Sequence, residues 1–255
     1  MDDLAAASDI LVTRVCMKNH DGLDHVVGVR KNLRQLNYIA YEYGNIQQLE
    51  ERGMRRRSCI LLQGPEGTGR MYTAFALAHD CGLDLCLVHV QEVFVDDEDR
   101  TLANLRSVFS SIDEDRALYL FDDVDGIVHR HRTSALLTNL IKRNAIMGRS
   151  LLVFTSLPGV FSQDTHLCQA LDMVLTFGLP EGDQLADLFR IYLPEHEEMA
   201  HSSRIASTCE DMTHSEIARV LNQIRIEALA GGSEITTGQV LNTLLDNLHS
   251  IRFHE

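Results

Sequence analysis

The sequence has little positive charge and no tryptophan. It holds 23 lysines and arginines against 37 aspartates and glutamates, which gives a net charge of −14 over 255 residues. Binding to nucleic acid or to an anionic membrane is driven by clustered positive charge, so this balance argues against both partners. With 6% aromatic residues, the chain also has little material for a stacking surface. We therefore expect no membrane and no nucleic acid among its partners.

Long apolar runs and paired cysteines are missing as well. No uncharged stretch approaches the roughly 18 residues that a membrane span needs, and the acidic N-terminus lacks signal-peptide features. None of the six cysteines forms the Cys-x-x-Cys pair of a zinc ribbon or redox site. The composition, 45% hydrophobic and 24% charged, is typical of a packed globular protein. We expect reduced thiols and an intracellular protein of the cytoplasm or nucleus.

Five short apolar runs are spaced along the first two thirds of the chain. Each run is continuous, which is typical of strands buried on both faces of a parallel sheet. Stretches with helical spacing separate the first four runs, and this alternation predicts right-handed β-α-β units. The runs are 59–62, 85–88, 117–121, 151–154 and 173–177, and the helical stretches are 71–81, 102–112 and 136–146. A helix over 29–51 is expected to precede the first strand.

From residue 181 onward the apolar pattern is helical only. Three sets of side chains recur at helical spacing, and 231–233, Gly-Gly-Ser, separates the last two predicted helices. We expect an N-terminal extension at 1–21, an α/β core at 22–180 and a small all-helical domain at 181–255. The recurring side chains are Leu185, Leu188, Phe189 and Tyr192, then Ile217, Val220, Leu221 and Ile224, then Val240, Leu241, Leu244 and Leu248.

A glycine-rich loop follows the first predicted strand and leads into a helix. A phosphate-binding loop has Gly, four residues, Gly, Lys, then Ser or Thr. Its glycines let backbone N–H groups curl around phosphates at the N-terminus of the helix. The candidate nucleotide-binding residues are therefore Gly64, Pro65, Glu66, Gly67, Thr68, Gly69, Arg70 and Met71.

Three positions of this loop depart from the pattern. Arg70 stands where a lysine reaches the terminal phosphates, and a planar guanidinium does not simply replace a compact ammonium. Met71 replaces the hydroxyl that ligates Mg²⁺, a role that a thioether does not fill. Glu66 adds a negative charge beside the expected polyphosphate. The loop therefore predicts weak or absent binding of ATP or ADP and makes Mg²⁺ doubtful, and a plain glycine turn is the alternative.

Two acids end the third predicted strand. An acid at this place beside a phosphate loop holds Mg²⁺, and the next acid positions the attacking water. Asp122 is thus the candidate metal ligand and Asp123 a candidate catalytic residue. Because Asp123 is one methylene shorter than the usual glutamate, it can miss the water by about 1 Å, a misplacement that can cost roughly 100-fold in rate. The alternative is that both acids only cap the following turn.

Together these motifs resemble the AAA module of the AAA+ ATPase superfamily from about residue 22 to 248. The resemblance implies a P-loop NTPase-type parallel sheet sandwiched by helices and followed by a helical lid. It implies adenine contacts from Val26 and Val27, a Walker A loop at 64–71 and a Walker B strand at 118–125. Ser156 stands where the family's sensor 1 strand has a water-polarising asparagine, and 212–217 resembles the start of the lid helix near the adenine. ATP or ADP as cofactor, and other AAA subunits or a protein client as partners of a homo- or hetero-oligomer, are implied with it.

Several further family positions are changed. The stretch that carries two arginine fingers in the family is 166–172 here and contains no arginine. The lid motif at 214–217 lacks its glycine, and Asp96 replaces the glycine of a pore loop. With Asp123 and Ser156 at altered catalytic positions, we expect a hydrolysis-impaired AAA+ ATPase-like subunit with an assembly or regulatory role. The alternatives are a slow Mg-ATP-dependent ATPase that remodels protein complexes, and a pure interaction module with a vestigial loop.

Four arginines precede the first predicted strand, at Arg52, Arg55, Arg56 and Arg57. They are consistent with a solvated loop or with contact to an acidic partner or nucleic acid.

Overall fold

The computed structural model describes residues 11–18, 20–127, 130–161 and 164–252. Residues 1–10 and 19 of the predicted N-terminal extension therefore lie outside the described residues. The chain forms two compact units. The first comprises residues up to 26 with 30–64 and 70–176, and the second comprises 27–29, 65–69 and the residues from 177 onward. Nowhere in the described ranges is a helix long and apolar enough to cross a membrane.

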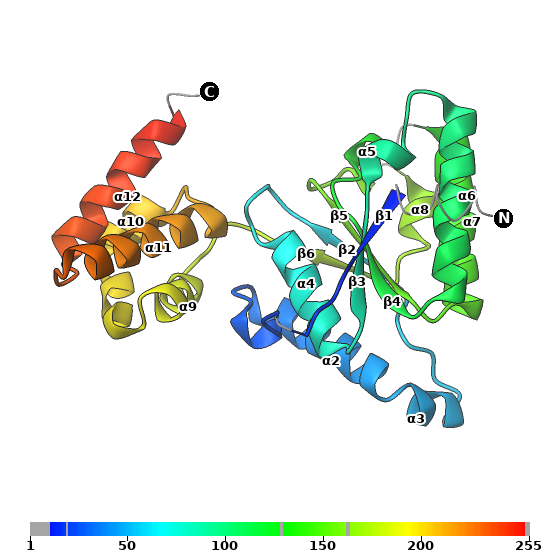
Figure 1. Cartoon of the computed structure of the whole chain (residues 1–255), viewed down its shortest axis with the longest axis horizontal. Helices are drawn as coiled ribbons and strands as arrows, with labels where there is room; N and C mark the ends of the chain where they lie inside the picture. Colours follow the sequence, from blue (N-terminus) through cyan, green and yellow to red (C-terminus); the bar gives the residue numbers. More distant parts are fainter. Residues whose placement is uncertain (1–10, 19, 128–129, 162–163, 253–255) are drawn as a thin grey trace. The chain divides into compact units, whose positions relative to one another are not determined.

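The first unit is built on a six-stranded sheet in the order β1-β3-β4-β5-β2-β6. The strand β1 is antiparallel to β3, and all other pairs are parallel. Helices cover both faces, with α6 and α7 on one side and α2 and α4 on the other (Figure 1). The strands are β1 (Val12–Val15), β2 (Cys59–Gln63), β3 (Asp84–Val88), β4 (Ala117–Phe121), β5 (Leu151–Ser156) and β6 (Met173–Thr176). The helices are η1 (Leu23–His25), α2 (Arg30–Gly44), α3 (Ile46–Glu51), α4 (Arg70–Asp80), α5 (Val90–Val93), α6 (Glu98–Glu114), η2 (Asp125–Ile127), α7 (His131–Met147) and α8 (Thr165–Cys168).

Burial on both faces explains why the central strands read as continuous apolar runs. Every residue of β4 is buried, because a strand between two helical layers has no solvent side. On one face, Phe121 stacks on Phe154 of the neighbouring strand at 4.7 Å between ring centroids. The five apolar runs are the five parallel strands, so the predicted α/β fold is confirmed.

Two local features differ from the sequence-based expectation. The edge strand β1 was not predicted, because it is only four residues long and partly exposed, and it is held by pairing with β3 and not by an apolar run. The helix expected over 29–51 is two helices, α2 and α3, which break at Asn45 with φ −127° and ψ 32°. Gly44 and Asn45 are poor helix formers, which accounts for the break.

Among the residues that the structure describes, the second unit contains five helices and its own hydrophobic core. The core residues include the apolar side chains that recur at helical spacing after residue 181. The longest helix begins with a capping box between Thr213 and Glu216 and ends at Gly232, which adopts the left-handed conformation at φ 61°. The predicted helical part is thus confirmed. Its helices are α9 (Asp183–Tyr192), η4 (Pro194–His201), α10 (Ser203–Cys209), α11 (His214–Gly231) and α12 (Thr237–Arg252).

Candidate functional site

The glycine-rich loop connects the end of β2 to the start of α4. Gly67 and Gly69 have φ values of 72° and 88°, a left-handed conformation that side chains with a Cβ adopt only at a cost. The Thr68 hydroxyl donates to the Pro65 carbonyl at 2.7 Å and closes the loop on itself. These features position the loop backbone as a phosphate cradle requires.

Within the second unit, the loop meets the N-terminus of α11. The Ser215 N–H donates to the Gly67 carbonyl at 2.9 Å. A Cβ at Gly67 would lie 2.5 Å from Ser215 Oγ and 2.7 Å from Thr213 Oγ1. Glycine is therefore required at residue 67 both for its backbone angle and for this close approach.

Arg70, at the lysine position of the loop, is turned into the protein. Its side chain is buried, and Nη1 donates to the main-chain carbonyl of Ser156 at the end of β5. The Gly64 N–H donates to the same carbonyl at 3.0 Å. The start of the loop and the guanidinium of Arg70 are thus both attached to one peptide group of the sheet.

Ser156, at the sensor 1 position, is fully buried. Its hydroxyl donates to the carbonyl of Leu157 at 3.1 Å. The Ser156 hydroxyl is therefore engaged with the main chain, and the Ser156 carbonyl accepts the hydrogen bond from Arg70.

The acids Asp122 and Asp123 are joined by one side chain from the next strand. The Thr155 hydroxyl donates to Asp122 Oδ1 at 2.6 Å and accepts from the Asp123 N–H at 2.8 Å. The register pairs Phe121 with Phe154, so the residues that follow them lie side by side. Asp123 has φ 57°, an uncommon conformation for a residue with a Cβ.

Asp125 completes the acidic group at this end of the sheet. Its carboxylate accepts from the Leu157 N–H at 2.9 Å and 3.3 Å. Burial is the largest cause that raises the pKa of Asp125, and the Asp123 carboxyl raises it further, while the Leu157 N–H and the Arg70 guanidinium oppose the change. Arg70 is thus close enough to act on the Asp125 carboxyl.

Among the described residues, no hydrogen bond or ion pair joins the remaining predicted site residues to one another. Glu66 is exposed, and Met71 is 46% exposed on the first turn of α4. Val26 is buried in the first unit, whereas Val27 packs against the core of the second. The roles of Thr155 and Asp125 were missed from the sequence. A threonine at the end of an otherwise apolar strand was the available signal for Thr155.

The residues suit phosphate better than they suit Mg²⁺. The loop has two left-handed glycines just before a helix N-terminus, and a backbone arranged in this way is suited to phosphate. The Asp122 carboxylate already accepts a hydrogen bond from Thr155. Met71 offers only a thioether, although Mg²⁺ prefers hard oxygen ligands. The donor set therefore does not fit a conventional Mg²⁺ site.

Comparison with known proteins agrees with this architecture. Residues 60–179, from β2 to just after β6, match the ATPase family associated with various cellular activities (AAA). The chain is also similar to an uncharacterized AAA family ATPase, y4kL, of Sinorhizobium fredii, at 23% identity over 201 residues. That match covers 75% of this chain, and the chain spans 60% of the length of that relative. The match over residues 60–179 and the distant relative together support an AAA+ module in this part of the chain.

Proposed function

We propose that this AAA module is hydrolysis-impaired and acts as an assembly or regulatory subunit in an AAA-type oligomer. The observation that carries the proposal is the buried Arg70, whose guanidinium donates to the Ser156 carbonyl. A lysine at this position would extend toward the terminal phosphates, whereas Arg70 directs its charge to the sheet and to Asp125. Less positive charge is then available to a polyphosphate.

The catalytic positions support the same proposal. Ser156 uses its hydroxyl internally, and Met71 offers no oxygen to a metal. The segment 166–172 has no arginine, and an arginine finger is worth roughly 10³ to 10⁵ in rate where it operates. We propose that the remaining groups, Asp122 and Asp123, do not sustain efficient hydrolysis by themselves.

We propose further that the loop retains weak binding of ATP or ADP that does not depend on Mg²⁺. The residues assigned to this site are Gly64 to Met71, with Val26 and Val27 at the adenine. Support comes from the left-handed glycines Gly67 and Gly69, which keep the cradle. The partners proposed are other AAA subunits or a protein client.

Calorimetric titration with ATP and ADP, each with and without Mg²⁺, tests the binding site. The expected result is weak binding that Mg²⁺ leaves unchanged. Met71→Thr should make binding Mg²⁺-dependent, because it restores the missing oxygen ligand. The matched control is Met147→Thr, which changes another exposed methionine on α7 and should have no such effect. No nucleotide binding in any variant would support a vestigial loop instead.

Phosphate release tests the alternative of a slow ATPase. One observation favours that alternative, because Asp123 is exposed and held at φ 57°, and strained residues gather at functional sites. Our proposal expects no Mg²⁺-dependent release above background. Release that disappears in Asp123→Asn would show a working enzyme and contradict the proposal.

Assembly is tested by analytical ultracentrifugation of the full chain with and without ATP. An assembly larger than one chain supports the subunit role. A monomer at every concentration, with and without ATP and with candidate AAA partners added, would contradict it.

A further inference from the structure

Three arginines line one cavity at the amino ends of the parallel strands. Arg56 precedes β2, Arg116 directly precedes β4, and Arg149 precedes β5. Since amino ends of parallel strands meet at one edge of a sheet, three positions far apart in sequence come together there. The cavity has a volume of about 370 Å³ and is also lined by α2 and α3 residues. We call it the arginine cavity; its other lining residues are Tyr43, Gly44, Ile46, Gln47 and Glu50.

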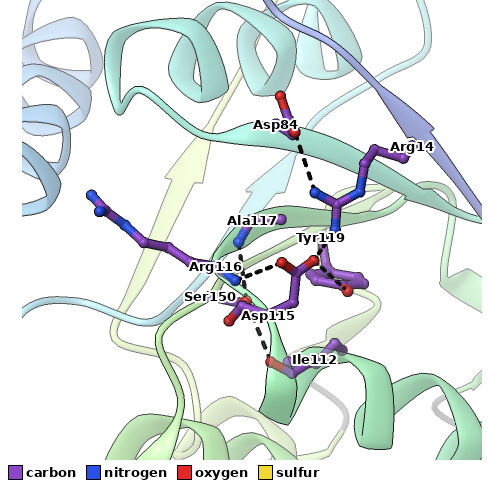
Figure 2. A network of polar contacts seen from close by, with 8 residues as sticks. All are labelled: Arg14, Asp84, Ile112, Asp115, Arg116, Ala117, Tyr119 and Ser150. Carbon is purple, nitrogen blue, oxygen red and sulfur yellow. Dashed lines mark hydrogen bonds and ion pairs between the residues drawn. The ribbon is translucent and has the colours of Figure 1, made fainter.

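Main-chain carbonyls hold two of the three guanidinium groups. Arg56 Nη2 donates to the Gly148 carbonyl, and the guanidinium lies 5.5 Å from the centre of the Tyr43 ring. Arg116 Nη2 donates to the Tyr43 carbonyl at 3.3 Å. Figure 2 shows the Arg116 side chain directed away from the neighbouring Asp115 and its partners. These arginines are thus positioned without neutralisation of their charge.

The charge of the cavity is unbalanced. Within the part of the chain that the structure describes, none of its arginines forms an ion pair with an acidic side chain. Glu50 is the one acid among the lining residues. Three positive charges and one negative charge leave a net charge of +2, in a protein whose total is −14.

Tyr43 and Arg56 pack against each other beside the cavity. Tyr43 is 1% exposed, its ring lies under the Arg56 guanidinium, and Arg56 partly offsets the rise that burial causes in the Tyr43 pKa. The Arg56 guanidinium is therefore oriented by the Tyr43 side chain as well as by the Gly148 carbonyl.

We propose that the arginine cavity binds a doubly charged oxyanion of the phosphate class, either free phosphate or the phosphate group of a small monoester. A dianion matches the net charge of the lining. Arginine forks match the oxygen geometry of phosphate. The site is independent of the glycine-rich loop, which follows β2 at its carboxyl end.

Nuclear magnetic resonance titration of the full chain with inorganic phosphate, and in a second arm with glycerol 3-phosphate, tests the proposal. Sodium chloride at matched ionic strength is the reference. Amide shifts at 43–47 and at 116 and 149 should saturate with phosphate and not with chloride. Tighter binding of the monoester than of phosphate would identify the monoester as the ligand, and the reverse order would identify free phosphate.

Arg149→Ala is the decisive variant, because Arg149 is exposed and makes no hydrogen bond that would be lost within the described ranges. It should weaken phosphate binding about tenfold or more, as expected for loss of a charge-assisted hydrogen bond. The matched control is Arg106→Ala, which removes an exposed arginine of α6 outside the cavity and should leave binding unchanged.

Three outcomes would overturn the proposal. Phosphate could shift only the amides at 65–69, which would place it at the glycine-rich loop. Arg149→Ala and Arg106→Ala could bind phosphate equally well. An acidic peptide without phosphate could saturate the cavity where phosphate and its monoester do not.

Discussion

Thr155 connects the two acids that the Walker B resemblance singles out. It is fully buried, donates to Asp122 and accepts from the Asp123 N–H. The conformation of Asp123 at φ 57° is thus supported by a side chain from the adjacent strand. A valine has nearly the same shape as threonine but makes neither hydrogen bond.

We predict that Thr155→Val lowers the free energy of unfolding by about 1–3 kcal/mol, because it leaves buried polar partners unsatisfied. Urea denaturation provides the measurement. Thr133→Val is the matched control, since Thr133 is also fully buried but its hydroxyl has no hydrogen-bond partner in the described chain. That variant should stay within about 0.5 kcal/mol of the parent or be slightly more stable. Equal losses in the two variants would contradict the assigned role of Thr155.

His214, the first residue of α11, makes stability depend on pH. Burial lowers its pKa from 6.5 to about 4. Its Nε2 lies 3.3 Å from Gln184 Oε1, and Nδ1 has no partner among the described residues. A positive charge at a helix N-terminus is also unfavourable. The neutral imidazole is therefore the form that the fold accommodates.

Because the folded pKa lies below the unfolded value, the unfolded chain takes up the proton first, and stability falls as pH decreases from about 6.5 to about 4. Replacing His214 should reduce the loss of unfolding free energy between pH 6.5 and pH 4 by up to about 3 kcal/mol. The comparison is urea unfolding of wild type and His214→Gln between pH 7 and pH 4. The control is His201→Gln, which replaces an exposed histidine of the same unit. If both variants keep the wild-type slope, His214 is not the titrating group.

At the scale of elements, β1 is a short strand that pairs with β3 at the edge of the sheet. Arg14 pairs with Asp84 at 3.2 Å and also with Asp115, which accepts from the Tyr119 hydroxyl (Figure 2). Leu11 packs into the core, and its carbonyl accepts from the His89 N–H at 2.8 Å. Besides its pairing with β3 and a Thr13–His89 side-chain hydrogen bond, the strand is therefore held by one buried anchor and one set of partly exposed ion pairs.

We predict that the apolar anchor matters more than the ion pairs. Leu11→Ala should cost about 2–5 kcal/mol, as for other buried leucines. Arg14→Ala should cost about 1 kcal/mol or less, because half-exposed ion pairs are screened by solvent. Thermal unfolding measures both losses, and hydrogen exchange of the His89 amide reports release of β1. A larger loss in Arg14→Ala would show that the ion pairs retain the strand.

At the scale of the whole molecule, the chain has a separate hydrophobic core in each unit. Leu105 belongs to a core cluster of the sheet unit and Leu221 to that of the helical unit. Both side chains are fully buried. A cavity in one cluster therefore removes packing from that unit.

We predict that Leu105→Ala and Leu221→Ala each cost about 2–5 kcal/mol and act on different segments. Hydrogen exchange followed by mass spectrometry should show faster exchange of β4 and β5 in Leu105→Ala. In Leu221→Ala, faster exchange is expected in α9 and α12. Uniform acceleration over both units in either variant would mean that the two cores unfold as one.

Local patterns predicted much of the fold and part of the candidate site. Continuous apolar runs located the five parallel strands, since burial on both faces removes alternation. The glycines at residues 64 and 69 located the loop by their spacing, and the left-handed angle of Gly69 favours a glycine there. The edge strand β1 and the break at Asn45 were missed. Strand pairing and a short interruption of a helix both leave only a weak periodic signal in the sequence.

Local sequence patterns did not predict the hydrogen-bond partners of the site residues, because these partners lie far away in the sequence. Arg70 was expected to face phosphate, and the structure attaches it to Ser156, 86 residues later in the chain. The sheet order puts β5 between β4 and β2, so its end meets both the loop and the acids. Sheet order depends on long-range pairing, which no window of sequence contains.

The sequence by itself determined the alternation of strands and helices, the glycine-rich loop and the residue types at the AAA motif positions, because periodicity and backbone preference are local properties. The tertiary structure alone decided where Arg70 directs its charge, how Thr155 joins the two acids, and that Arg56, Arg116 and Arg149 line one cavity. Each of these depends on which strand ends become neighbours when the sheet forms.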